Sequence, residues 1–311
     1  MSNKWTVMSN QIHMSTKADW RLEFKRLDGA FAPSTIRSYL GDVGIFVRWC
    51  ESEGYQPFPA SVETVCDFLE AQAPGLAPST VWRRLYAIRK AHRLLRLTDP
   101  TWDEEISITL RRVRRAKCGR PRQAKGLTKS YLEIFLKVQP NTPWGLRNRA
   151  MIALGYDLLT RRSELVAIRT EELERRADGT LRALIRRSKA DPFGFGRISF
   201  TSTRTARLVE DWLAWRGADI EYLFCPIYQS KPVNRCLSAT TVKRLIKASA
   251  SMAGLDQIDI DAFSGHSLRV GAAQDLLCAG HDTAAIMRAG GWKSVNVLGR
   301  YLELAEHNVW G

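Results

Sequence analysis

The chain has 311 residues, 45% of them hydrophobic, which is enough for two folded domains. No stretch approaches the roughly 18 consecutive apolar residues of a membrane span, and residues 1–17 lack the apolar segment of a secretory signal, so we expect a cytoplasmic protein with no membrane partner. The net charge of +15 favours a polyanionic partner, nucleic acid above all, over a solvated basic surface or an anionic membrane face.

The first part of the chain is expected to be helical. Residues 1–17 are polar and unpatterned, which is typical of a mobile arm. Over residues 18–118 the apolar spacing predicts a helical bundle, with helices at 19–28, 34–53, 61–73, 79–96 and 103–117. Two of these helices follow the same Ala-Pro-Ser-Thr segment, in which we expect a hydroxyl to cap the first turn.

Basic side chains crowd the fourth helix, where spacings of three and four place several of them on one face: Arg83, Arg84, Arg89 and Lys90. A solvated helix face is the alternative explanation for this group. The densest basic run leads from the fifth helix into residues 119–126: Arg111, Arg112, Arg114, Arg115, Arg120, Arg122 and Lys125. Glycines and a proline make this run an extended linker, suited to lying along DNA phosphates. A nuclear-localisation signal is the alternative.

Beyond residue 127 the pattern changes to helices interrupted by a small sheet. The helices are predicted at 128–138, 145–156, 161–169, 203–216, 238–252, 267–279, 282–289 and 294–304. Two strands, LRALIRRSK and FGRISFTS, are joined by a turn at 190–194. We therefore expect a second, α-rich domain over 127–311 with a small antiparallel β-sheet.

The six cysteines predict neither a metal site nor a disulfide framework. They are scattered without a CxxC pair, and only five histidines accompany them. We expect reduced thiols and no bound metal.

One group of residues is suited to breaking a phosphodiester bond without a metal. That reaction needs planar cations for the non-bridging oxygens, a positioned hydroxyl and a proton donor. His266 and Arg269 stand three residues apart at the start of a predicted helix, so both can face one anion. The other candidates, in chain order, are Arg161 in LTRRSEL, Lys189 at the strand turn, Trp292 in AGGW, and Tyr301.

The order Arg, Lys, His-x-x-Arg, Trp, Tyr resembles the signature of the tyrosine site-specific recombinases, the phage integrase family. The resemblance is strong over 150–311 and fainter over 20–125, where the helices resemble the core-binding domain of these enzymes. Arg162 is a departure, because the family usually has an aliphatic residue there. Arg161 is chosen as the first arginine for its distances along the chain to Glu164 and Lys189.

The resemblance implies a catalytic role for each of these residues. Arg161 and Arg269 would clamp the non-bridging oxygens bidentately, which lysine could not imitate. His266 would hydrogen-bond the phosphate and assist proton movement, Trp292 would donate its indole N–H, and Glu164 would orient its neighbours.

The resemblance also implies how the bond is exchanged. Tyr301 would attack the phosphate and form a 3′-phosphotyrosyl link, while Lys189 would protonate the leaving 5′ oxygen. A neutral phenol is a poor nucleophile, so Tyr301 must depend on nearby cations and a base. Because the new bond conserves the energy of the old one, neither ATP nor another cofactor is expected.

The expected partner is double-stranded DNA bearing an inverted-repeat site, with a dimer on each site and a homotetramer on two sites joined through a Holliday junction. The predicted helix from residue 238 resembles the one that enters the major groove, which makes Thr240, Lys243 and Arg244 candidate DNA contacts. Two other functions remain open: a type IB topoisomerase that nicks and reseals, and a catalytically idle DNA-binding protein derived from a recombinase.

Overall fold

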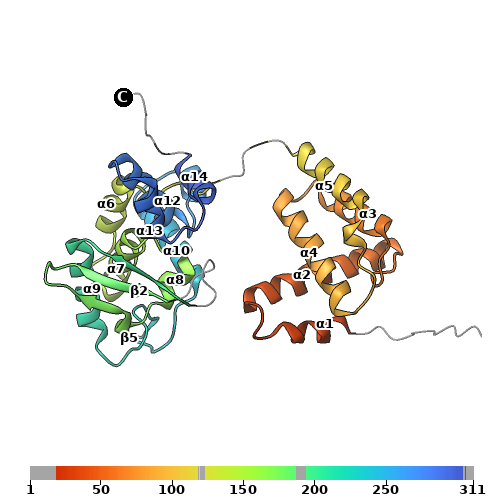
Figure 1. Ribbon diagram of the computed structural model, residues 1–311. Coiled ribbons are helices and arrows are strands. Elements are labelled where there is room, and N and C mark those ends of the chain that lie inside the picture. Colours follow the sequence, from red (N-terminus) through yellow and green to blue (C-terminus); the bar gives the residue numbers. More distant parts are fainter. Residues whose placement is uncertain (1–18, 118, 120–122, 187–193, 304, 306–311) are drawn as a thin grey trace, which may run out of the picture. The chain divides into compact units, whose positions relative to one another are not determined.

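The computed structural model describes residues 19–117, 119, 123–186, 194–303 and 305. The chain divides into two compact units, residues 1–121 and 122–311 (Figure 1). Helices dominate both, and the strands form small antiparallel sheets, which confirms the predicted fold class. Within the described ranges no helix is long and apolar enough to cross a membrane, and no cluster of His, Cys, Asp and Glu could hold a metal ion.

The described residues of the first unit form only helices and the loops between them. The helices are α1 (Trp20–Glu23), the 3-10 turn η1 (Phe24–Leu27), α2 (Pro33–Glu53), α3 (Val62–Gln72), α4 (Pro78–Leu94), the 3-10 turn η2 (Pro100–Trp102) and α5 (Glu104–Ala116). The single helix predicted over 19–28 is therefore two short pieces, whose Trp20, Phe24 and Leu27 are buried in the core.

The repeated Ala-Pro-Ser-Thr segments start α2 and α4 differently from our expectation. Each helix begins at the proline, and the preceding Ala32 or Ala77 is an N-cap with no side-chain hydrogen bond. Proline suits the first helical position because its missing N–H would have no partner there. The hydroxyl residues consequently lie inside the first turn, and the predicted hydroxyl cap is wrong.

His92 lies in the core of this unit as a neutral imidazole. Its Nδ1 lies 2.9 Å from the Ile88 carbonyl oxygen, to which it donates, and its Nε2 accepts from the Ala60 N–H at 3.0 Å. Burial lowers the pKa of His92 below its usual value, although the Ile88 carbonyl opposes this. Protonation would break the bond to Ala60 and place a charge among apolar side chains.

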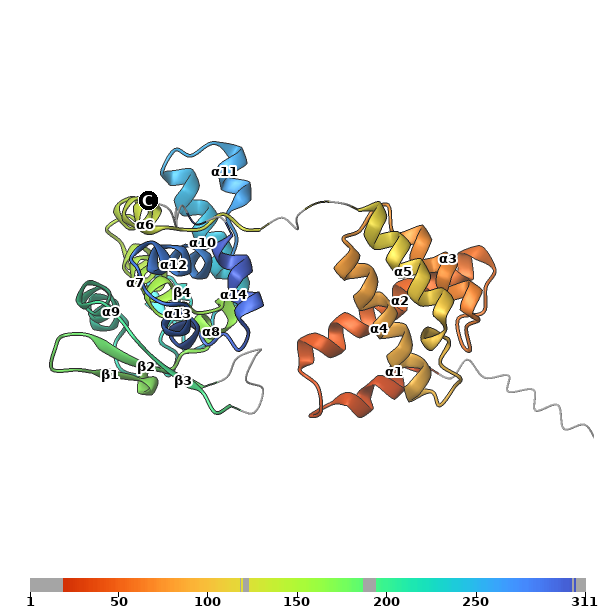
Figure 2. The same cartoon turned by 45° about the horizontal axis from the view of Figure 1, so that its top comes forward.

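The second unit is built on two central helices, α7 (Pro143–Asp157) and α12 (Ser267–Cys278) (Figure 2). Residues 150–154 of α7 and 267–274 of α12 are buried throughout. A helix that is buried on every side shows no clear amphipathic period, and it needs other elements around it. These are α6 (Lys129–Lys137), α8 (Arg162–Ala167), α9 (Thr203–Arg216), α10 (Ala239–Met252), α13 (Thr283–Gly290) and α14 (Val295–Leu302). The short α11 (Gln257–Ala262) packs against α10.

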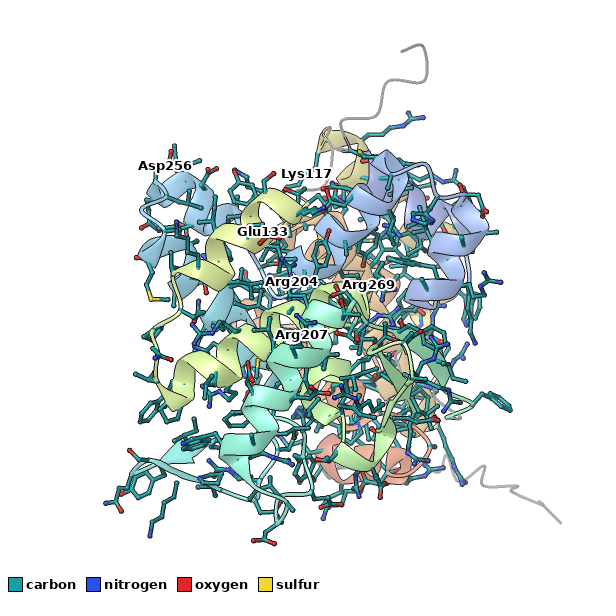
Figure 3. All side chains as sticks on the ribbon, turned by 90° about the vertical axis from the view of Figure 1, so that its left-hand side faces the viewer. Lys117, Glu133, Arg204, Arg207, Asp256 and Arg269 are labelled. Carbon is teal, nitrogen blue, oxygen red and sulfur yellow. The ribbon has the colours of Figure 1, made fainter. Side chains whose placement is uncertain are left out.

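A three-stranded antiparallel sheet follows α8 and the 3-10 turn η3 (Thr170–Glu172), in the order β1 (Leu173–Arg175), β2 (Leu181–Ile185), β3 (Arg197–Phe200). Ion pairs of α9 with β1 (Arg175 and Glu210) and with α6 (Glu133 and Arg204, Figure 3) connect these elements. The sequence predicted β2 and β3 but not β1, nor the hairpin β4 (Ile227–Tyr228) and β5 (Lys231–Pro232), because two or three residues are too few to show alternation. The short α11 was also missed, and most of the predicted turn at 190–194 lies outside the described residues.

The end of the predicted linker packs against α12. Lys125 donates its N–H to the Ala262 carbonyl at 2.9 Å, and Leu127 donates to that of Ser267 at 2.8 Å. A Cβ on Gly271 would lie 2.0 Å from the Leu127 oxygen, so only glycine permits this approach. The chain from Lys125 onward therefore belongs structurally to the second unit.

We expect His92 to make the first unit less stable in acid. The unfolded chain takes up a proton near pH 6.5, whereas folded His92 resists it, so stability should fall by up to about 1.4 kcal/mol per pH unit below that value. Hydrogen exchange of α4 peptides in the full chain, measured in urea at pH 7.5 and 5.5, reports this. His92→Gln should show a shallower pH dependence, and an equal dependence in both proteins would contradict the assignment.

Candidate active site

Arg269 is the centre of the site. It lies in the first turn of α12 and is fully buried (Figure 3). One Nη1–H donates to the Leu159 carbonyl, and the guanidinium carbon lies 3.7 Å from the ring centroid of Trp292. Within the described residues Nε and Nη2 have no hydrogen-bond partner. These two atoms form one edge of the guanidinium fork, the edge that binds an oxyanion bidentately.

Trp292 and Tyr301 pack edge to face beside this guanidinium. Their ring centroids lie 5.2 Å apart at an interplanar angle of 74°, and the Tyr301 ring centroid lies 5.9 Å from the guanidinium carbon of Arg269. Trp292 is buried, and its indole N–H has no partner among the described residues. The site thus has a second buried donor without an acceptor, which is costly unless a ligand supplies one.

The double glycine before Trp292 is explained by the turn. Gly291 has φ of +67° and ends α13 in the left-handed conformation, which glycine adopts without strain. A Cβ on Gly290 would lie 1.9 Å from the Trp292 ring, so the indole packs directly on that backbone.

Arg161 is anchored by Glu164 at the start of α8. Its Nη1 lies 2.5 Å from Glu164 Oε1, and its backbone N–H donates to Oε2 at 3.0 Å. The Glu164 side chain is only 2% exposed, whereas that of Arg161 is 19% exposed. A buried carboxylate that holds the arginine by its side chain and its backbone has the contacts that an orienting role requires.

His266 is the N-cap of α12 and remains partly open to solvent. Surrounding protein lowers its pKa first, and the positive charges of Arg162, Arg269 and Arg161 lower it further, against Glu164. The imidazole is therefore neutral at neutral pH. The Arg162 side chain lies next to the backbone just before His266, since a Cβ on Gly265 would lie 2.8 Å from the Arg162 Cδ.

The structure thus brings five of the six predicted catalytic residues to one region, around the start of α12. Lys189, the sixth, lies outside the described residues. Sequence reasoning missed Arg197, which lies among these residues, and the left-handed Leu159, with φ of +47°. No sequence signal marks either one, because an arginine in a strand and a leucine after a helix are both ordinary.

The predicted DNA-binding residues differ in how available they are. Arg83 binds both oxygens of Asp42, and Arg84 is buried between Asp42 and Gln72. Lys125 pairs with Asp259 at 2.7 Å and lies over the Tyr131 ring. These three side chains are held by the protein itself, which reduces what they can offer to phosphates.

Others have part of their cation committed to internal contacts. Arg89 donates to Thr101, and Lys90 lies over the Phe31 ring. The candidates on α5 and α10 are all exposed: Arg111, Arg112, Arg114, Arg115, Thr240, Lys243 and Arg244. Two of them still lie within ion-pair distance of a carboxylate, Arg111 of Glu104 and Arg112 of Glu70. Arg120 and Arg122 lie outside the described residues.

Replacing Glu164 should destabilise the second unit. Glu164→Gln removes the carboxylate shared by Arg161 and Arg197 and leaves buried positive charge uncompensated, at a cost of about 3 kcal/mol. Urea unfolding of the full chain, followed by hydrogen exchange of α8 peptides, measures this. Adding Arg197→Met should recover part of the loss, whereas a single variant as stable as the wild type would contradict the pairing.

Comparisons with known proteins agree with the resemblance. Residues 125–308 match the model of the phage integrase family. The chain is 30% identical over 293 residues to the recombinase Cre of Escherichia phage P1, covering 88% of this chain and 84% of that protein. It is also 30% identical over 307 residues to an integrase/recombinase XerD homologue of Selenomonas ruminantium, covering 95% and 87%.

Solved structures show the same fold. A lambda integrase dimer bound to a COC′ core site superposes with a TM-score of 0.62 at 16% identity, covering 93% of this chain and 96% of that one. The XerH recombinase bound to its palindromic difH substrate superposes with a TM-score of 0.62 at 18% identity, covering 86% and 75%. The chain therefore belongs to the phage integrase family, the tyrosine site-specific recombinases that cut and rejoin DNA.

Proposed function

We propose that this protein is a site-specific recombinase that cleaves duplex DNA through Tyr301 and exchanges strands between two sites. The observation that carries the proposal is the buried, unpartnered donor edge of Arg269 beside the unpartnered Trp292 indole, both next to the Tyr301 ring. A donor at a solvated surface bonds to water, whereas a buried donor needs an acceptor from the protein or from a ligand. A phosphate with two charged non-bridging oxygens supplies the missing acceptors.

The chemistry follows from that placement. The Tyr301 hydroxyl oxygen attacks phosphorus, the bond from phosphorus to the 5′ oxygen breaks, and a 3′-phosphotyrosyl link forms. Arg269 and Arg161 stabilise the charge that develops on the non-bridging oxygens. The neutral imidazole of His266 can accept the phenolic proton or bind the phosphate. Lys189, assigned through the family resemblance, protonates the departing 5′ oxygen.

The assembly we propose has a dimer on each inverted-repeat site and a tetramer on two sites, with a Holliday junction between two strand exchanges. It acts on DNA in the cytoplasm without metal, ATP or cofactor. Residues 18–118 form the core-binding domain and 127–311 the catalytic domain, joined by the basic linker 119–126 and preceded by the arm 1–17. The exposed Thr240, Lys243 and Arg244 on α10 support its entry into the major groove.

Covalent trapping tests the proposed nucleophile. Duplex DNA that carries the target site, nicked near the cut so that the freed end diffuses away, should give a protease-sensitive adduct with wild type and none with Tyr301→Phe. An adduct in the mutant would identify another nucleophile. No adduct with wild type would indicate an idle DNA-binding protein, and relaxation of plasmid without the site and without recombinants would indicate a type IB topoisomerase.

The fork of Arg269 can be tested separately from its charge. Arg269→Lys keeps the cation but cannot hold two oxygens in one plane, so single-turnover cleavage should fall about 100-fold or more while DNA affinity stays close to wild type. Arg207→Lys, on the exposed surface of α9, is the matched control and should cleave normally. A parallel loss of affinity in Arg269→Lys would mean that Arg269 serves binding and not the transition state.

A further inference from the structure

Arg197 joins three segments that carry the candidate catalytic side chains. It is the first residue of β3, and its side chain is 14% exposed. Nη1 donates to the Ala289 carbonyl at 2.5 Å, and Nη2 donates to the Leu158 carbonyl at 2.7 Å. The same Nη2 lies 3.5 Å from the Leu159 carbonyl oxygen and 3.8 Å from Glu164 Oε2.

Each of these partners adjoins a different part of the site. Leu159 lies two residues before Arg161, and its carbonyl also accepts from Arg269. Glu164 holds the side chain and the backbone of Arg161. Ala289 is followed by the glycine turn that leads to Trp292. A single guanidinium therefore contacts the supports of both arginines and of the indole.

The local backbone is shaped to admit this side chain. A Cβ on Gly291 would lie 2.7 Å from the Cδ of Arg197, so a glycine at this position leaves room for the arginine side chain. The same glycine ends α13. Leu159 is left-handed, a conformation that costs a non-glycine residue roughly 1 kcal/mol. Bonds from two guanidinium groups to the carbonyl of this residue, or to that of its neighbour Leu158, offset the cost.

Arg197 itself is poorly placed to bind DNA phosphate, because its donors are turned to protein carbonyls. Burial lowers its pKa to about 10 against the opposing charge of Glu164, and Arg161 adds to the lowering. It still carries its full charge at neutral pH. A buried cation close to two others costs desolvation and repulsion, and Arg197 offsets this cost through its contacts with Glu164 and the backbone carbonyls.

We propose that Arg197 is a positioning residue for strand cleavage, which holds the Arg161, Arg269 and Trp292 segments in their reactive arrangement without contacting the phosphate. This inference rests on the proposed recombinase function. It predicts that removing the guanidinium slows chemistry and leaves DNA affinity nearly unchanged. A misplacement of about 1 Å at a reacting group is sufficient to cost about 100-fold in rate.

The test compares Arg197→Met and Arg197→Lys with wild type and with Arg182→Met, which removes a partly exposed arginine from the neighbouring strand β2. We measure single-turnover adduct formation on the nicked duplex, DNA affinity by titration, and melting temperature. Arg197→Met should cleave about 100-fold more slowly, with affinity within about threefold of wild type. Arg197→Lys cannot reach all three carbonyls, so its cleavage rate should lie between those of wild type and Arg197→Met. Arg182→Met should cleave at the wild-type rate.

Chemical rescue separates positioning from a general loss of packing. Arg197→Ala leaves a buried space shaped for a guanidinium, so tens of millimolar guanidinium chloride should raise its cleavage rate several-fold and leave wild type unchanged. A packing defect would not respond in this way.

Four results would overturn the inference: normal cleavage by Arg197→Met, equal losses of affinity and rate, absence of rescue, or failure of both Arg197→Met and Arg197→Lys to fold. If wild type forms no adduct, the recombinase function itself fails, and the inference falls with it. That case is recognised from the wild-type arm alone.

Discussion

The second unit depends on the burial of one guanidinium group, that of Arg269. A cation without exposure to solvent must be compensated by nearby dipoles, π-electrons or opposite charge. Here the Leu159 carbonyl and the face of Trp292 provide part of that compensation. Both depend on unusual backbone, since Leu159 is left-handed and Trp292 follows a glycine turn. The remaining donor edge has no partner among the described residues, so it is available to a bound anion.

The charge balance around Arg269 leads to the same conclusion. Glu164 lies within ion-pair distance of Arg161 and Arg197, and its negative charge also acts on Arg269. Three cations around this carboxylate leave excess positive charge in a poorly solvated region. Such an excess destabilises the free protein and stabilises a bound phosphate, most strongly when its negative charge increases in the transition state. Burial, followed by the positive charges of Arg162, Arg269 and Arg161, lowers the pKa of His266, so its imidazole is neutral at neutral pH. Arg161 and Arg269 thus contribute both to the excess positive charge of the site and to the neutral state of the histidine.

The sequence predicted the parts of the site that obey local spacing. His266 and Arg269 share one helix turn, Trp292 lies just after the end of α13, and Tyr301 lies in α14. Helices were located well where an apolar period was present, and elements of two or three residues were missed. Arg197 could not be recognised, because its importance comes from carbonyls of residues 38 and 92 positions away. A buried arginine and an exposed one cannot be told apart in a sequence. Arg84, for example, was expected to contact DNA but is buried next to Asp42.

The segment that enters the second unit and the helix α14 both contact α12. Leu127 crosses it at Gly271, and a Cβ on the preceding Gly126 would lie 2.1 Å from the Gln274 amide oxygen. The amide nitrogen of Gln274 donates to the Tyr301 carbonyl at 3.3 Å. The segment that enters the second unit and the helix that carries Tyr301 therefore both contact Gln274, five residues after Arg269 in the tightly packed α12.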